Sequence, residues 1–288
     1  MKKAISCPLC DDTGWKPIEK SNVRQVVRCD CWYDQIAEQR LHEARIPPRY
    51  KNCTLDNFRT DTDSLIQAVQ KCREFVAAFP VVEKGLLFLG APGVGKTHLA
   101  TATLIEIIKR TNAAGLFFDV RELLRVIRDT YNPVVRTTEF EVIRPVVDAQ
   151  LLVLDDLGAE KTSEWVDETM TLIISSRYNQ RRPTIFTTNY LDRQPDERSP
   201  AEVLIERVGF RIHSRLHEMC TFVDMKALDY RRVGDEATPE ALDRLEKHGR
   251  SISDSGLPSR AKAARAQLRQ PVRDTRADLK WPGGRAGS

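Results

Sequence analysis

A glycine-rich segment, GAPGVGKT at residues 90–97, constrains the fold of this chain more than any other stretch. The apolar run GLLFL precedes it, and apolar residues at helical spacing follow it: Leu99, Leu104, Ile107 and Ile108. In the order strand, glycine loop and helix, backbone amides surround a phosphate and the helix amino terminus faces the anion. The sequence therefore predicts a nucleotide phosphate site on a buried strand of an α/β fold.

The residues of this loop have distinct expected roles. The spacing Gly-x-x-x-x-Gly-Lys-Thr predicts backbone contacts to the β-phosphate of ATP. Lys96 is expected to bind the β- and γ-phosphates as a point charge, and Thr97 to offer its hydroxyl to Mg²⁺. We assign ATP binding to the loop and the residue after it: Gly90, Ala91, Pro92, Gly93, Val94, Gly95, Lys96, Thr97 and His98.

Polar residues follow two further predicted strands. LLVLDD, residues 151–156, indicates a strand buried on both faces that ends in Asp155 and Asp156. Asp155 is expected to reach Mg²⁺, and Asp156 to polarise the attacking water. TIFTTN ends in Asn189, whose amide would hold that water or the γ-phosphate. Each acid alone is also compatible with a solvated loop, but together with Lys96 these residues form a predicted catalytic group.

Five segments in this order resemble a known family: GAPGVGKTHLA, LLVLDDLGAEKTSEW, RRPTIFTTN, RIHSRL and LDYRR. They are similar to the AAA+ ATPases of the DnaC/DnaI class of replicative helicase loaders, to which the IstB transposition helpers are close relatives. The resemblance covers about residues 7–232. It implies a P-loop ATPase with a parallel sheet of strand order 5-1-4-3-2, helices on both faces, and oligomerisation on ATP.

The resemblance also implies roles for three arginines. Arg211 and Arg215 are four residues apart, which places both on one face of a helix. Arg215 resembles the finger that one subunit inserts into its neighbour's ATP site, with Arg211 beside it, and Arg231 resembles the sensor of the subunit's own nucleotide. Asp156 stands where many AAA+ enzymes carry Glu, so we expect slow, switch-like hydrolysis.

Two histidines lie on the same predicted helix. His213 and His217 have the i, i+4 spacing of metal ligands. Ser214 stands where a metalloprotease would carry Glu, and the sequence reveals no third ligand. We therefore assign no metal to these two residues from the sequence.

Four of the seven cysteines are clustered near the amino terminus: Cys7, Cys10, Cys29 and Cys31. Four thiolates suit tetrahedral Zn²⁺, and so short a segment has too small a core to fold unaided. The CPLCDDTGW, RCDCW and RIPPRY segments also resemble the amino-terminal module of the loader class. Reduced, unligated cysteines or a redox pair are the alternatives. The isolated Cys53, Cys72 and Cys220 are expected to be buried apolar residues.

These features divide the 288 residues into four parts. We expect a zinc-binding, helicase-interaction module at 1–45, with a helix at about 33–44. A linker with a lead-in helix at about 64–79 would occupy 46–80, and the AAA+ domain 81–233. The remainder, 234–288, is expected to be a basic, disordered tail, because it has few apolar residues and many Pro, Gly and Arg.

Charge is distributed unevenly between these parts. From Arg250 onward, nine Lys or Arg against three Asp or Glu give a net charge of +6, although the whole chain has only +4. The tail could therefore add salt-sensitive DNA affinity or act only as a solubilising segment. In the ATPase part, Val120, Leu123, Leu124, Ile127 and Tyr131 form a predicted apolar stripe. The opposite face, which carries Arg121, Arg125 and Arg128, is either a DNA contact or a solvated surface.

Three functions fit these observations. The first is a cytoplasmic ATPase that loads a hexameric replicative DNA helicase on single-stranded DNA. The second is an IstB-like helper that assembles on duplex DNA and directs a transposase. The third is an ATPase with no DNA role. The cysteine module favours the first, because IstB-like helpers generally lack it. No apolar run has the length of a membrane helix, so we expect no membrane partner.

Overall fold

The computed structural model describes residues 7–20, 23–161, 163–192 and 203–233. The predicted disordered tail, 234–288, lies outside the described residues and stays a prediction. None of the helices in the described ranges combines the length and hydrophobicity that crossing a bilayer requires.

The amino-terminal part consists of a hairpin, a helix and a lead-in segment. Strands β1 and β2 pair in antiparallel fashion, with Trp15 opposite Arg28. Cys29 then precedes the first turn of α1, which begins three residues earlier than expected because Asp30 favours the helix amino terminus. The elements are β1 (Trp15–Lys20), β2 (Val23–Arg28), α1 (Asp30–Glu43), a 3-10 turn η1 (Pro48–Tyr50) and α2 (Asp63–Ala78).

The rest of the described chain alternates strands with helices. Its elements are β3 (Gly85–Leu89), α3 (Lys96–Thr111), β4 (Gly115–Asp119), α4 (Val120–Asp129), α5 (Glu139–Asp148), β5 (Leu151–Asp155), α6 (Glu164–Asn179), β6 (Thr184–Thr188), α7 (Leu204–Met219), β7 (Cys220–Asp224) and α8 (Tyr230–Val233).

These five strands, β3 to β7, form a parallel sheet in the order β4-β5-β6-β3-β7. Read from β7 and counted from β3, this is the predicted order 5-1-4-3-2. Strands β3, β5 and β6 are completely buried, and the apolar run at residues 151–154 predicted this for β5. The AAA+ fold class is therefore confirmed.

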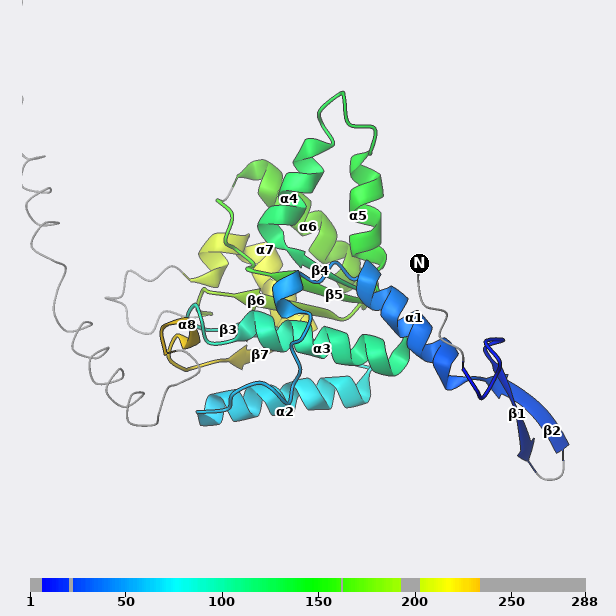
Figure 1. The fold of residues 1–288 in the computed structure, drawn as a ribbon. Coiled ribbons are helices and arrows are strands. Elements are labelled where there is room, and N and C mark those ends of the chain that lie inside the picture. Colours follow the sequence, from blue (N-terminus) through cyan, green and yellow to red (C-terminus); the bar gives the residue numbers. More distant parts are fainter. Residues whose placement is uncertain (1–6, 21–22, 162, 193–202, 234–288) are drawn as a thin grey trace, which may run out of the picture. The chain divides into compact units, whose positions relative to one another are not determined.

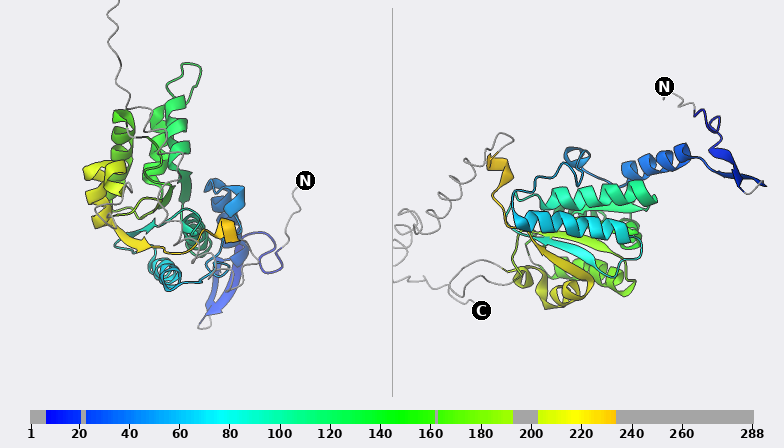
Figure 2. Two further views of the ribbon diagram at one scale, coloured as in Figure 1. Left: turned by 90° about the vertical axis from the view of Figure 1, so that its left-hand side faces the viewer. Right: turned by 90° about the horizontal axis from the view of Figure 1, so that it is seen from below.

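Helices cover both faces of this sheet (Figure 1). Leu86 and Phe88 of β3 point into a core with α2 and α3, and Leu87 and Leu89 point into a second core with α4, α5, α6 and α7. Figure 2 shows α2 and α3 lying side by side on the first face. Because the strands are parallel, the carboxyl ends of β3, β5 and β6 lie at one edge of the sheet, where the predicted site residues follow them.

The end of α1 is joined to the ATPase core. Ala44 is completely buried, and its carbonyl accepts a hydrogen bond from the backbone N–H of Phe117 in β4. The guanidinium of Arg45 lies 4.6 Å from the centre of the Phe118 ring. By contrast, the two strands of the hairpin, β1 and β2, contact mainly each other. A cut between the hairpin and α1 would therefore disturb the ATPase less than a cut at residue 45.

The predicted apolar stripe on α4 is correct except for its last member. Val120, Leu123, Leu124 and Ile127 are buried in the second core. Tyr131 is 53% exposed, because α4 ends at Asp129 and the helical spacing no longer applies.

Candidate nucleotide site

The glycine loop joins the carboxyl end of β3 to the first turn of α3, as predicted. Gly93 and Gly95 have φ angles of 86° and 98°, a region that glycine adopts without strain. A Cβ atom at Gly93 would collide with the carboxylate of Asp229, and one at Gly95 would collide with the ring of Phe58. The loop therefore requires glycine at these positions both for its backbone conformation and for its close neighbours.

Lys96 is buried at the start of α3, and its ammonium group faces the loop. Its Nζ donates hydrogen bonds of 2.8 Å to the carbonyls of Gly90 and Ala91. Burial lowers the pKa of Lys96 to about 8, against the opposing effect of the Asp156 and Asp155 charges. A triphosphate in the loop would supply the negative charge that this buried ammonium lacks.

Thr97 and Asp155, the two residues predicted to hold Mg²⁺, lie next to each other. The Thr97 hydroxyl donates to both carboxylate oxygens of Asp155, at 2.9 and 3.1 Å. The Thr187 hydroxyl of β6 donates to the same carboxylate at 2.6 Å, and accepts from the backbone N–H of Asp156 at 2.9 Å. Three elements that lie far apart in the sequence therefore converge on one carboxylate.

The environment of Asp155 suits a cation. Burial raises the pKa of Asp155 to about 6, and the neighbouring charges of Asp156 and Asp119 act in the same direction. One carboxylate oxygen of each of these three acids lies within 4.8 Å of the others. Hard oxygen ligands of this kind are those that Mg²⁺ prefers, so Thr97 and Asp155 are the residues that would hold it beside bound phosphates.

Asp156 and Asn189 form the next layer of the site. Asn189 Nδ2 donates a 3.0 Å hydrogen bond to Asp156 Oδ1. Asp156 has a φ of 57°, in the left-handed region, which turns the chain sharply after β5. The two residues predicted to handle the attacking water are therefore in contact.

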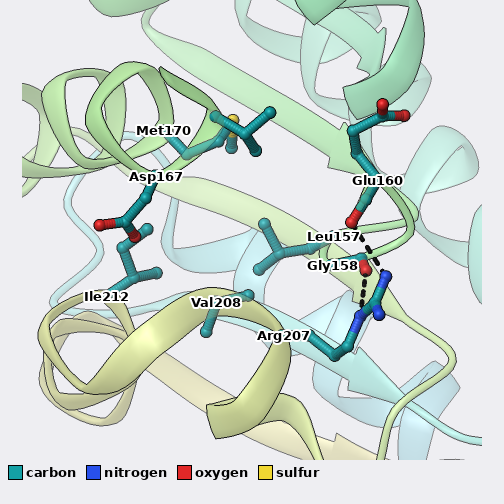
Figure 3. A pocket seen from close by; sticks show the side chains of 9 residues that line it. Leu157, Gly158, Glu160, Asp167, Met170, Arg207, Val208 and Ile212 are labelled. Atoms are coloured by element: carbon teal, nitrogen blue, oxygen red, sulfur yellow. Dashed lines mark hydrogen bonds between the residues drawn. The ribbon is translucent and has the colours of Figure 1, made fainter. Parts of the chain in front are cut away.

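The loop that follows these acids is held from α7 by Arg207 (Figure 3). Its guanidinium donates from Nε to the carbonyl of Gly158 and from Nη2 to the carbonyl of Glu160, both at 2.9 Å. Figure 3 also shows a small hollow beside this clamp, lined mainly by apolar side chains such as Met170 and Val208. Arg207 thus fastens the β5–α6 loop to the first part of α7.

Two chain segments outside the predicted loop border the phosphate site. His98 Nε2 lies 3.0 Å from the carbonyl of Thr54 and from Asn57 Oδ1, and its ring packs edge to face on Phe58. This packing brings the lead-in segment against Gly95. The lead-in segment therefore packs against the phosphate loop at both Gly95 and His98.

The α8 region borders the other side of the loop. The backbone N–H of Tyr230 donates to the carbonyl of Gly93 at 3.1 Å. The positive charge of Arg231 contributes to the lowered pKa of Lys96. Arg231 is exposed, and its role as a sensor of the subunit's own nucleotide stays a prediction.

Arg211 and Arg215 both lie on the helix α7, as the sequence predicted. Arg215 Nη1 donates to the carbonyl of Arg211 at 3.3 Å, and its guanidinium carbon lies 5.9 Å from the centre of the Tyr178 ring. Within the described residues, neither arginine has a hydrogen bond to the Lys96, Thr97, Asp155 or Asp156 side chains. The roles of Arg215 as a finger for a neighbouring subunit and of Arg211 beside it stay predictions.

The four clustered cysteines come together at the base of the hairpin. Their sulfur atoms all lie within 4.8 Å of one another, with 3.8 Å between Cys7 and Cys29 and 3.4 Å between Cys10 and Cys31. Tetrahedral zinc with bonds of about 2.3 Å places sulfurs about 3.8 Å apart, so the four residues fit this ion. The hydrogen bond with Cys10 and, after it, burial raise the pKa of Cys31.

The hairpin itself is held by an aromatic sandwich. The guanidinium carbon of Arg28 lies 3.8 Å from the centre of the Trp15 ring and 4.3 Å from that of Trp32. The backbone N–H of Cys29 donates to the carbonyl of Gly14, which ties the two cysteine pairs together. The sequence predicted the four cysteines as zinc ligands but not this sandwich, which depends on the register of two strands.

Comparison with known proteins also indicates a nucleotide-binding protein. The model of the family of IstB-like ATP binding proteins matches residues 34–235. The replicative helicase loader DnaC of Escherichia coli (strain K12) is 26% identical over 179 residues, which are 62% of this chain and 69% of that protein.

Solved structures give the same result. A crystal structure of the DnaC helicase loader is 36% identical with a TM-score of 0.55, and covers 62% of this chain and 100% of that one. A crystal structure of DnaI is 26% identical with a TM-score of 0.53, and covers 63% of this chain and 95% of that one. The chain is therefore an AAA+ protein that belongs to the family of IstB-like ATP binding proteins and is homologous to the DnaC and DnaI helicase loaders.

Proposed function

We propose that this protein is an ATP-switched loader that binds a hexameric replicative DNA helicase and helps to deposit it on single-stranded DNA during replication. The observation that carries the proposal is the similarity to the DnaC helicase loader, which extends over the whole of that solved chain. The AAA+ site supplies the switch, and the cysteine module supplies a surface for the partner. Such a protein would act in the cytoplasm.

The nucleotide chemistry follows from the site. Lys96 and the loop amides would hold the phosphates, while Thr97 and Asp155 would hold Mg²⁺, which shields the developing charge. Asp156, positioned by Asn189, would orient and polarise the attacking water. Asp156 has one methylene less than Glu, which supports slow hydrolysis and a long-lived ATP state.

Assembly would complete the site. Arg215 is the proposed finger for the ATP of a neighbouring subunit, with Arg211 beside it and Arg231 acting within its own subunit. A planar, permanently charged guanidinium suits the charge that develops on the transferred phosphate. ATP would therefore favour the oligomer, and hydrolysis would release it.

The amino-terminal module is the proposed helicase contact. The module exposes the apolar side chains of Leu9, before the hairpin, and of Trp15, Val23 and Val26 in it, with exposed fractions of 62%, 44%, 55% and 63%. Large exposed apolar side chains concentrated in so small a module support its use as a protein interface. Zinc held by Cys7, Cys10, Cys29 and Cys31 would keep the surface folded.

The proposed contact to single-stranded DNA lies on α4 and its neighbour α6. Arg125 and Arg128 are exposed, and the guanidinium of Arg128 lies 4.8 Å from the centre of the Trp165 ring. Tyr131 packs edge to face on the same ring. Basic groups beside aromatic rings support backbone contacts together with base stacking.

The alternative is an IstB-like helper that assembles on duplex DNA and directs a transposase. It is retained because the matching family model is described as IstB-like. The cysteine module favours the loader over this alternative.

The two functions are separated by a pull-down with the hexameric helicase of the same genome in the presence of ATP. We expect the full chain to retain the helicase, and a chain that lacks residues 1–28 to lose it while still binding ATP. The cut precedes α1 because Ala44 is buried against the ATPase core. Cys29→Ser should also lose the helicase, together with its zinc, whereas Cys53→Ser serves as a control for a cysteine outside the cluster. Recruitment of a transposase to duplex DNA without helicase binding would favour the helper.

A further inference from the structure

We propose that Asp192, His213 and His217 form a second metal site, which binds a divalent transition-metal ion such as Zn²⁺. The site joins the segment after β6 to the half of α7 that carries Arg211 and Arg215. It is separate from both the nucleotide site and the cysteine cluster.

The three side chains converge on one point. His213 Nε2 lies 2.8 Å and His217 Nε2 lies 3.1 Å from the same oxygen, Asp192 Oδ1. The ligand atoms of all three residues lie within 4.8 Å of one another. The sequence predicted the pairing of the histidines on one helix face but offered no third ligand. The structure supplies it from a different segment, 21 residues before His213.

The surroundings hold the histidine rings in place. The His217 ring stacks on Phe222 of β7, with 4.3 Å between the ring centres and 13° between the planes. The two histidine rings meet edge to face, with their centres 4.7 Å apart. The His213 side chain is 15% exposed and the His217 side chain 46%, so an ion can reach the site from solvent. Fixed rings and an open side are what a three-ligand metal site requires.

The distances fit a metal ion after a small adjustment. Tetrahedral zinc with bonds of about 2.0 to 2.1 Å places nitrogen and oxygen ligands about 3.3 Å apart. The observed separations of 2.8 and 3.1 Å need to open by only a few tenths of an ångström. Imidazole nitrogen with one carboxylate oxygen favours zinc and its neighbours over Mg²⁺ or Ca²⁺. The remaining position would hold water.

The position of the site gives it a role in assembly. Gly209 has φ and ψ angles of 75° and 158°, which interrupt α7 between residues 204–208 and 210–219. The second of these parts carries both arginines, and the interruption uncouples it from the helical turn before it. A metal bound to His213, His217 and Asp192 would hold this part in one orientation relative to β6. It would thereby position Arg215 for a neighbouring subunit.

The test is a calorimetric titration of the full chain with Zn²⁺ after one equivalent has been supplied for the cysteine cluster, without nucleotide. We expect the wild type to bind one equivalent more than His217→Ala or Asp192→Ala, or to bind that equivalent at least about tenfold more tightly. His42→Ala removes an exposed histidine from α1 and should match the wild type. Zinc that binds to the cysteines or to the acids of the nucleotide site is bound equally by the wild type and the variants, so it does not contribute to the difference between them.

A second measurement examines the helix directly. Zinc should slow amide hydrogen exchange of residues 210–219 in the wild type and in His42→Ala, but not in His217→Ala. The same zinc stoichiometry and affinity in the wild type, in His217→Ala and in Asp192→Ala would overturn the proposal. Loss of zinc binding without any change in exchange would keep the metal site and overturn its role in holding α7.

Discussion

Asn189 Nδ2 donates a 3.0 Å hydrogen bond to Asp156 Oδ1, and so joins the residue after β6 to the residue after β5 at the edge of the sheet that carries the phosphate loop. The two strands are neighbours, so this contact fixes the carboxylate without help from the loop. In the proposed mechanism, this contact orients the carboxylate that polarises the attacking water.

Asp156→Asn should bind ATP within about threefold of the wild type and lose turnover by two to four orders of magnitude, because an amide cannot accept the proton of the attacking water. Nucleotide affinity by fluorescence titration and phosphate release would measure both effects. Asn179→Ala, at the exposed end of α6, is the control. Retained turnover in Asp156→Asn would remove Asp156 from the catalytic role.

Lys96→Ala should weaken ATP binding by about 10- to 100-fold, the effect of losing a charge-assisted hydrogen bond. In the wild type, burial lowers the pKa of Lys96 to about 8. ATP affinity should therefore fall on the order of tenfold between pH 7 and pH 9, as the free protein loses this proton. Lys96→Arg keeps its charge over that range, so its affinity should vary less. An equal decline in both proteins would show that another group is responsible.

Asp155→Asn should stabilise the protein when neither Mg²⁺ nor nucleotide is present. Burial raises the pKa of Asp155 to about 6, from a model value of 3.8, so the folded state holds this proton more tightly than the unfolded state. The group therefore lowers the free energy of unfolding as pH rises through the window from about 4 to 6. At pH 7.5 the variant should be more stable by about 1 to 3 kcal/mol, and this gain should disappear near pH 4.

Urea denaturation at the two pH values measures this difference. Asp156→Asn, which alters the adjacent and less buried carboxylate, is the matched comparison. A gain for Asp155→Asn that is the same at pH 4 and pH 7.5 would contradict the assignment to a buried charge.

Arg215→Ala should leave ATP binding by the isolated subunit unchanged and reduce hydrolysis in the assembly by about three orders of magnitude or to background. An equal mixture with Asp156→Asn tests the direction of action. Random association gives about a quarter of interfaces that join an intact finger to an intact site, so about a quarter of the activity should return. No recovery at any ratio would place Arg215 in its own subunit's site. Arg211→Ala in the same assay identifies the finger.

The features that the sequence predicts best are those with local causes. The glycine loop, the buried strands and the order of the sheet follow from residue spacing, from continuous apolar runs and from the family resemblance. Tyr131 was misplaced because helical spacing was extended past Asp129, where α4 ends. Burial by periodicity holds only while the helix continues.

The features that the sequence leaves open depend on contacts between distant segments. Thr187 accepts from the backbone of Asp156 and donates to Asp155 because β5 and β6 are neighbours. Asp192 meets His213 and His217 through a fold that no spacing in the sequence encodes. An acid beside a strand end has many possible partners, and only the three-dimensional arrangement selects among them.

The most direct test of the loader function is the amount of helicase hexamer that becomes bound to a closed circle of single-stranded DNA. A closed circle has no end, so a ring-shaped helicase can encircle it only if the ring opens. We expect this protein with ATP to raise the amount of bound helicase several-fold above helicase alone, and Lys96→Ala to have no such effect. Equal amounts of bound helicase with and without the wild-type protein would contradict the loader function.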